Sequence, residues 1–424
     1  MSGRRSFIKK SAFTIAGSLL AGVNADGRGQ RFLKIKNVSD EDAFWKEVRK
    51  QFPLTHARTY FNNGTIGPSP YPVLEAVRLK MEELNALGEY KGQEDSRKPL
   101  ADFINVPFHE LSLTHNTTEG INIIAAGLPL KRGDEVIMTS HEHAGNALPW
   151  LNQKKLKGFK IRIFTPADTA DESLNLINDL ITDRTRVIAV PHITCTTGHL
   201  LPVRQIADLA HDKGIWVFYD GAHAAGSIAL DLKKIECDFY ASCGHKWLLG
   251  PSGTGFLYVR EEMFDIVQTE FIGAYSDTGW EISEERQTLS GYVPDAHRYD
   301  YGTQSAALSN GLKAAVAFMN EIGMPLVESY SRGMATLLRN NLANLDGDLE
   351  ILTPEEEISR STMVTFRLPD MHYRDFGELA SENKFRIRLV PESKLNAIRI
   401  STHIYNNKDE IDRFTSLVAK VIRR

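Results

Sequence analysis

The sequence predicts an α/β protein with a mostly parallel central sheet, helices on both faces of that sheet, and a smaller α+β C-terminal domain. Two observations lead to this fold class. Short apolar runs alternate with helical patterns through the middle of the chain, as in a parallel sheet that is buried on both faces. After about Ser305 the pattern changes to long helices followed by short strands. The 424 residues are enough for one large and one smaller domain.

Short apolar runs in the middle of the chain are predicted to be strands. These runs are Asp134–Thr139, Lys160–Phe164, Arg186–Val190, Ile215–Tyr219, Asp238–Ala241 and Thr254–Val259. Helical patterns lie between several of them, and one of these helices, Val203–Lys213, is closed by Gly214. Because ligands bind beyond the carboxyl ends of parallel strands, we searched the residues that follow each run for a site.

The other predicted elements lie on either side of this region. Ahead of it, an amphipathic stretch at Asp40–Gln51 and apolar residues at helical spacing over Tyr71–Leu87 predict two helices. Beyond it, the sequence predicts helices at Ala306–Ile322, at Leu326–Leu345 and from Lys408 onward, and strands at Thr362–Leu368, Phe385–Leu389 and Ala397–Ser401. We therefore expect an N-terminal arm and helix at 27–60, a large domain at 61–304 and a small C-terminal domain at 305–424.

Residues 1–26 predict a signal peptide of the twin-arginine type. Arg4-Arg5-Ser6-Phe7-Ile8-Lys9 precedes the apolar run Ala12–Ala21, and Ala25 is the small residue that a signal peptidase requires. The run is too short to span a bilayer comfortably, so we expect no stable membrane insertion. The protein is then exported to the periplasm. The alternatives are a basic N-terminal tail on a cytoplasmic protein and an uncleaved membrane anchor.

The composition is that of a globular protein and excludes several other classes. The chain is 42% hydrophobic and 25% charged, which argues against disorder. Its net charge of −4 gives no cationic field for nucleic acid. The three cysteines, Cys195, Cys237 and Cys243, form no CxxC pair, so we expect neither a metal site nor a disulfide framework.

An aspartate and a lysine follow two successive predicted strands. Ile215–Tyr219 runs directly into Asp220, and Asp238–Ala241 leads into the segment that contains Lys246. Both side chains would project at the same edge of the sheet, 26 positions apart (246 − 220) in the sequence. A buried lone carboxylate is costly, so Asp220 needs a partner. Taken singly, Lys246 could be a surface lysine and Asp220 a helix N-cap.

Together the two residues fit pyridoxal 5′-phosphate (PLP). A lysine amine forms a Schiff base with the aldehyde of this cofactor and later moves protons at the substrate Cα. A carboxylate that faces the pyridine nitrogen keeps it protonated, so that the ring accepts the electrons released at Cα. With His245 adjacent and glycines on both sides, we interpret Lys246 as the Schiff-base lysine and Asp220 as the partner of the ring nitrogen.

The segment His115–Gly120 is a candidate seat for the phosphate, because it precedes the apolar helical run Ile121–Leu128. Thr117 and Thr118 would present backbone N–H groups and hydroxyls at a helix N-terminus, where phosphate binds readily. A plain capping box, with Asn116 or Thr117 as the N-cap, is the alternative for the same residues.

A series of motifs, in order along the chain, resembles the class V aminotransferase family of fold-type I PLP enzymes. The motifs are Asn62-Asn63-Gly64, Asn116-Thr117-Thr118-Glu119, His141-Glu142-His143-Ala144, His192-Ile193-Thr194-Cys195, Asp220-Gly221-Ala222-His223, His245-Lys246-Trp247, Gly302-Thr303-Gln304 and Arg399-Ile400-Ser401. The resemblance extends from about Phe61 to the C-terminus. It implies a fold-type I enzyme that uses PLP and acts on a small amino acid.

The resemblance implies a role for several residues around the cofactor. His143 would stack on the pyridine ring, His223 would lie beside the ring hydroxyl, and both would join Lys246 and Asp220. The implied phosphate ligands are Thr117, Thr118, His245 and either Ser242 or Cys243, and Cys195 is assigned to the same cofactor site. The family usually has a hydroxyl three positions before the lysine, whereas Cys243 occupies that position here.

The remaining implied roles concern the substrate and a second subunit. Arg399 would bind the substrate α-carboxylate in a bidentate pair, which a lysine cannot reproduce. Asn63 is assigned to the same substrate site. Thr303 would reach the phosphate of a neighbouring subunit, which implies a homodimer with shared active sites.

Two departures narrow the expected function. A cysteine desulfurase needs a nucleophilic cysteine on a loop ahead of the arginine that binds the carboxylate, but Arg386–Ala397 contains none and no cysteine follows Cys243. In addition, Asp220-Gly221-Ala222-His223 and His245-Lys246-Trp247 resemble the isopenicillin N epimerase branch of the family more closely. Both departures argue against a persulfide mechanism.

We therefore expect PLP chemistry of the aminotransferase or epimerase type at the Cα of an amino acid, or of an amino-acid residue in a small peptide. One alternative is a C–S or C–Se lyase similar to cysteine desulfurases and selenocysteine lyases. Another is a PLP-binding protein without turnover. A Rossmann dehydrogenase does not fit, because no GxGxxG follows an early strand.

Overall fold

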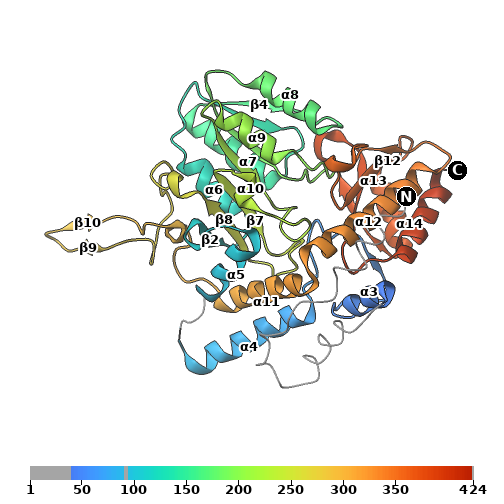
Figure 1. Cartoon of the computed structure of the whole chain (residues 1–424), viewed down its shortest axis with the longest axis horizontal. Coiled ribbons are helices and arrows are strands. Elements are labelled where there is room, and N and C mark those ends of the chain that lie inside the picture. The colour runs from blue at the N-terminus through green and yellow to red at the C-terminus, as the bar shows by residue number, and fades with distance from the viewer. Residues whose placement is uncertain (1–39, 90–93, 423–424) are drawn as a thin grey trace.

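The computed structural model describes residues 40–89 and 94–422 (Figure 1). The predicted signal peptide at 1–26 lies outside these residues. A large sheet with its helices forms one side of the molecule, and a smaller C-terminal unit packs beside it. Among the described residues, no helix is both long and apolar enough for a membrane crossing.

The central sheet is mostly parallel, which confirms the predicted fold class. Its strand order is β2-β8-β7-β6-β5-β3-β4. The strands are β2 (Leu111–Thr114), β3 (Glu135–Thr139), β4 (Lys160–Phe164), β5 (Thr185–Pro191), β6 (Trp216–Asp220), β7 (Phe239–Cys243) and β8 (Gly255–Val259). Strands β3 to β7 run parallel, whereas β8 and β2 are antiparallel. The predicted strands agree with these within a residue or two at each end.

Alternate residues of each strand enter two separate hydrophobic cores. In β5, Ile188 and Val190 join one core, while Val187 and Ala189 join the other. This is the consequence of side chains that point to opposite faces in turn. Helices α5 (Glu94–Ile104), α8 (Ala170–Leu180), α9 (Val203–His211), α10 (Leu232–Ile235) and α11 (Ala306–Ile322) belong to the first core, and α6 (Thr117–Gly127) and α7 (Ala144–Lys157) to the second.

The C-terminal unit is a four-stranded antiparallel sheet with its own hydrophobic core. The strand order is β11-β12-β15-β14. The strands are β11 (Glu350–Ile351), β12 (Met363–Arg367), β14 (Arg388–Val390) and β15 (Ala397–Ser401), and the helices are α12 (Met324–Ala343), α13 (Tyr373–Glu382) and α14 (Lys408–Ile422). The predicted strand at Phe385–Leu389 is divided in the structure, because β13 (Phe385–Arg386) ends before β14 begins.

The N-terminal arm packs against this C-terminal unit. Helix α3 (Glu41–Arg49) begins at Asp40, whose side chain accepts a hydrogen bond from Ala43 N, and its Trp45 stacks on Tyr330. Strand β1 (Thr59–Tyr60) then pairs in parallel with β13. Helix α4 (Tyr71–Leu87) follows and lies along α11 (Figure 1). The first described segment of the chain therefore packs against elements that lie more than 280 positions later in the sequence.

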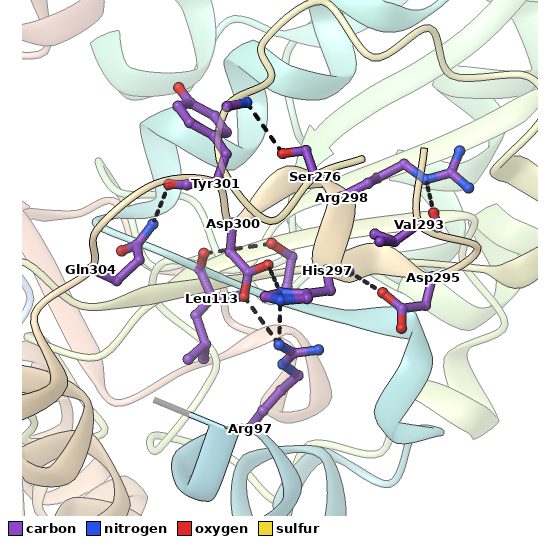
Figure 2. A network of polar contacts seen from close by, with 12 residues as sticks. Arg97, Leu113, Ser276, Val293, Asp295, His297, Arg298, Asp300, Tyr301 and Gln304 are labelled. Carbon is purple, nitrogen blue, oxygen red and sulfur yellow. Dashed lines mark hydrogen bonds and ion pairs between the residues drawn. The ribbon is translucent and has the colours of Figure 1, made fainter. Parts of the chain in front are cut away.

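A long β-hairpin, formed by β9 (Trp280–Ile282) and β10 (Gln287–Leu289), extends away from the body (Figure 1). Arg97, His297 and Asp300 hold its base (Figure 2). Arg97 Nη2 lies 2.8 Å from His297 Nδ1 and 3.4 Å from Asp300 Oδ2, and His297 also pairs with Asp300. Because Arg97 and Asp300 are buried, this network fixes the loop on which the hairpin stands.

Candidate active site

A cavity of about 260 Å³ lies at the carboxyl ends of β6 and β7 and reaches the C-terminal unit. Strand β6 ends at Asp220, and β7 lies beside it in parallel, with Ala241 opposite Asp220. Lys246 follows β7 after a short turn and lines the same cavity. The predicted convergence of this aspartate and this lysine at one edge of the sheet is confirmed.

Most of the residues predicted for the site line this cavity. They are Thr117, Thr118, His143, Cys195, Asp220, His223, Cys243, His245, Lys246 and Arg399. Arg399 comes from β15, and the others lie at the ends of strands of the large sheet or in the segments that directly follow them. The cavity is therefore built by both units of the molecule. Asn63, Ser242 and Thr303 do not line it.

The N-terminus of α6 forms the cradle predicted for a phosphate. Asn116 is the N-cap and accepts a hydrogen bond from Glu119 N at 3.0 Å, so the capping alternative holds for Asn116. Thr117 and Thr118 are thereby free to face the cavity. The buried Oγ1 of Thr117 and Nδ1 of His245 have no hydrogen-bond partner among the described residues. Such orphaned polar atoms beside a helix N-terminus suit a bound phosphate.

Asp220 is buried and is held in place by the turn that follows its strand. Its Oδ1 accepts a hydrogen bond from Ala222 N at 2.9 Å. Burial raises the pKa of Asp220, and the hydrogen bond from Ala222 and the charge of Lys246 oppose that rise. A buried carboxylate that needs a cationic partner is suited to the protonated nitrogen of a pyridine ring.

Lys246 faces a histidine from the neighbouring strand end. Its Nζ lies 3.3 Å from His223 Nε2, and the Nε1–H of Trp247 donates to His223 Nδ1 at 3.1 Å. The peptide bond that joins His245 to Lys246 is held by the loop of Gly67, because Gly67 N donates a hydrogen bond to His245 O at 2.7 Å. The lysine is therefore presented to the cavity on a fixed backbone.

His143 lines the cavity at the N-terminus of α7, where it is the N-cap. Its Nδ1 accepts a hydrogen bond from Gly145 N at 3.0 Å. Burial of the ring, followed by the charge of Lys246, lowers the pKa of His143 to about 4. The ring is therefore uncharged at neutral pH, as an aromatic platform for another ring requires.

Arg399 projects from β15 and is buried to 1% exposure. Its Nη1 donates to the Cys195 carbonyl, whereas Nε and Nη2 have no hydrogen-bond partner among the described residues. Burial lowers the pKa of Arg399 to about 9, and the neighbouring charge of Arg388 contributes. A buried guanidinium with unused donors is costly unless it binds an anion, and a carboxylate matches its geometry.

The structure adds Arg388, which the sequence reasoning missed. This side chain lines the cavity from β14, directly opposite Arg399 in the antiparallel register, and it pairs with Glu392. Its Nη1 donates to Glu392 Oε2 at 3.2 Å. The sequence does place Arg388 in a predicted strand that precedes the predicted strand of Arg399. It does not show which residues of the two strands lie opposite each other.

Three predicted site residues lie outside the cavity. Asn63 is buried behind the lysine, and its amide is used within the chain: Nδ2 donates to Lys246 O at 3.4 Å and Oδ1 accepts from Tyr405 at 2.9 Å. Ser242 donates to Gly221 O at 2.8 Å on the opposite face of β7 from Cys243, so Cys243 and not Ser242 lines the cavity. Thr303 is exposed outside the cavity, and its predicted contact with a second subunit remains a prediction.

The cysteines of the chain are buried. Burial raises the pKa of Cys195 to about 11 and raises that of Cys237 and Cys243 as well. Because the thiolate is the nucleophilic form, none of these thiols is prepared to attack sulfur. The structure thus gives no substitute for the cysteine that the Arg386–Ala397 segment lacks.

Known proteins are similar to this chain over most of its length. The family model described as aminotransferase class-V matches residues 77–414. A probable cysteine desulfurase of Pyrococcus abyssi is 29% identical over 402 residues, covering 89% of this chain and 98% of that protein. The isopenicillin N epimerase of Amycolatopsis lactamdurans is 27% identical over 394 residues, covering 89% and 98%.

Solved structures give the same result. The apo structure of a cysteine desulfurase from Thermococcus onnurineus has a TM-score of 0.80 at 27% identity, covering 89% of this chain and 98% of that one. The cystine C–S lyase C-DES, solved with its product cysteine persulfide, has a TM-score of 0.79 at 25% identity, covering 87% and 99%. A lysine variant of C-DES carries glycine covalently linked to PLP. The fold is that of fold-type I PLP enzymes, the cofactor is PLP, and the chain belongs to the class V aminotransferase family.

Proposed function

We propose that the protein removes the Cα proton of a small amino acid, with Lys246 as the base and Arg399 as the binding residue for the α-carboxylate. One observation carries this proposal. Lys246, Asp220 and Arg399 come from different parts of the chain and line a single cavity. Nothing in the site suggests a binding protein without turnover, because each group that Cα chemistry needs is in place.

Each residue has a defined task in this proposal. PLP, when bound, supplies a ring that accepts the electrons released at Cα. Asp220 holds positive charge on the ring nitrogen, and His143 supports the ring from one face. Arg399 fixes the carboxylate, so that the Cα–H bond is directed towards Lys246 Nζ, which takes the proton and later returns it.

The relatives support cleavage of a C–S or C–Se bond more strongly than the transaminase or epimerase outcome that the sequence favoured. Several curated relatives of this chain are described as probable cysteine desulfurases. The buried thiols of this chain favour a lyase that leaves the sulfur on the departing group, as a cystine lyase does, because no cysteine of the enzyme is then needed.

The second candidate is an aminotransferase or epimerase that acts on an amino acid or on an amino-acid residue of a small peptide. One specific observation favours it. Arg388 and Glu392 stand in the segment where a desulfurase needs its mobile cysteine, and Arg388, which lines the cavity, forms an ion pair with Glu392. The similarity to the Amycolatopsis epimerase agrees with this candidate.

The test compares purified protein with the variant Lys246→Ala. The wild type should show the visible band of lysine-bound PLP and should form cysteine persulfide and pyruvate from cystine, whereas the variant should lose both. Lys234→Ala is the control, because Lys234 is on the surface. Formation of a keto acid or of the opposite enantiomer without any persulfide would select the second candidate. A wild type that binds no PLP under loading conditions would refute the proposal.

Two predictions about the whole protein accompany this function. The homodimer with shared sites is supported by the exposed Thr303 and by the exposed apolar side chains Trp280 and Ile282 on the hairpin. Light scattering of the full chain tests it.

Export through the twin-arginine route rests on residues 1–26 alone, and Arg4→Lys combined with Arg5→Lys should keep the protein in the cytoplasm.

A further inference from the structure

We propose that Trp247 is a positioning residue that fixes the tautomer of His223, so that the Nε2–H of His223 is directed at Lys246 Nζ. The residues concerned are contiguous in space. Trp247 Nε1 lies 3.1 Å from His223 Nδ1, and Lys246 Nζ lies 3.3 Å from His223 Nε2. Each nitrogen of the imidazole therefore has one partner, and the two partners are successive residues of the chain.

The position of the proton follows from the chemistry of the indole. An indole N–H can only donate a hydrogen bond, so the His223 nitrogen that faces it must carry no proton. A neutral imidazole has a single N–H, which then lies on Nε2. Burial lowers the pKa of His223 well below its ordinary value, and nearby Lys246 and Arg399 add to that effect. The imidazole is therefore neutral, and only one tautomer is compatible with Trp247.

The indole itself has no freedom to turn away. Trp247 is fully buried, and its backbone oxygen accepts a hydrogen bond from His403 Nε2 at 2.9 Å. Gly226 approaches this backbone so closely that a Cβ there would lie 2.4 Å from Trp247 O. The donor that selects the tautomer is thus held by the burial of its side chain and by the close contacts of its backbone.

The tautomer decides what His223 offers to the site. With the proton on Nε2, the ring donates to an acceptor in the cavity, which is the lysine nitrogen once that amine has lost its proton, or an oxygen that takes its place. With the proton on Nδ1, Nε2 would instead accept a hydrogen bond from the protonated lysine. The amine would then be held in its unreactive, charged form. Trp247 therefore selects a donor at Nε2 without touching substrate or cofactor.

The test is ¹⁵N NMR of the apo full-length chain with ring-labelled histidine, in which the His223 signals are assigned by their loss in His223→Gln. In the wild type, Nδ1 should have the shift of an unprotonated nitrogen and Nε2 that of a protonated one. In Trp247→Phe the two shifts should move towards each other or exchange. A protonated Nδ1 in the wild type overturns the proposal, even if the variant fails to fold.

Trp150→Phe is the matched control. Trp150 is another fully buried indole, and its Nε1 donates to Asn146 at 3.1 Å. This variant should leave the His223 signals unchanged, and an equal shift in both variants would show a packing effect and contradict the proposal.

A second readout is the visible band of lysine-bound PLP in the holoenzyme, which should shift in Trp247→Phe only. This readout rests on the proposed function. A wild type without the band refutes that function and leaves the NMR result to decide the tautomer.

Discussion

At the scale of single residues, the site depends on polar groups that the fold buries without satisfying them. Arg399 is the largest case, since Nε and Nη2 have no partner among the described residues. Gly64 leaves the space beside this guanidinium, because a Cβ there would lie 2.7 Å from Nη2. The free energy lost by burying such a group is regained only when an anion binds. Under the proposed function, Arg399 therefore contributes mainly to the affinity for the substrate.

Arg399→Lys should therefore raise KM much more than it lowers kcat. A lysine keeps the charge but loses the bidentate pair, and a charge-assisted hydrogen bond of about 1.5–3 kcal/mol corresponds to roughly a 10- to 100-fold rise in KM. Steady-state kinetics on the amino acid that gives turnover measure this effect. Arg367→Lys, on the exposed end of neighbouring β12, should change neither constant. An unchanged KM in Arg399→Lys would remove the carboxylate role.

At the scale of elements, the site is placed by strand ends and by loops that pack against the lysine. Gly67 belongs to the loop between β1 and α4, and its N–H donates to His245 O. A Cβ at this position would lie 1.9 Å from Lys246 O. The close approach of two backbones, rather than an unusual backbone angle, is the reason for glycine here.

Gly67→Ala should displace the peptide of Lys246 and so lower both the melting temperature and the fraction of protein that binds PLP. Backbone atoms cannot yield to a clash of this size as a flexible side chain could. Gly333→Ala is the control, because it adds a methyl group within α12 where no atom lies within 4 Å. That control should be neutral or slightly stabilising, by up to about 1 kcal/mol. Equal melting temperatures for the two variants would contradict the argument.

The strand pattern also explains which site residues the sequence could reveal. Asp220 and Lys246 were predictable because apolar runs mark where parallel strands end. The choice between Ser242 and Cys243 stayed open in the sequence, because successive residues of a strand face opposite sides and the predicted strand ended at Ala241, whereas β7 continues to Cys243. Arg388 was missed because its neighbour Arg399 is set by strand register, which one sequence does not display. The β9–β10 hairpin was missed because each of its strands has only three residues, and the brief alternation Trp280-Glu281-Ile282 does not stand out in the sequence.

At the scale of the whole molecule, buried histidines make the fold sensitive to acid. Burial lowers the pKa of His192 to about 3 and that of His199 and His403 to about 4, from an ordinary value of 6.5. Between pH 6.5 and about 4 the unfolded chain therefore binds more protons than the folded chain. Stability rises with pH across this window and is lost as the pH falls through it.

The melting temperature should consequently fall steadily as the pH is lowered from about 6.5 to about 4. His403→Gln should reduce the slope, because glutamine still donates a hydrogen bond to Trp247 O but takes up no proton on unfolding. Scanning calorimetry at a series of pH values compares the two proteins. A variant slope equal to that of the wild type would show that His403 makes no contribution to acid sensitivity.

The pairing of β1 with β13 has a consequence for how the enzyme is made. Thr59 lies opposite Phe385, and Arg399, which completes the cavity, follows still later in the chain. Contacts of such large sequence separation form slowly, and here they cannot form until synthesis of the polypeptide is almost finished. We therefore expect the nascent chain to be unable to hold its cofactor on the ribosome. Loading then follows complete synthesis and comes before the predicted export, and a shortage of PLP would leave a fully synthesised but empty enzyme.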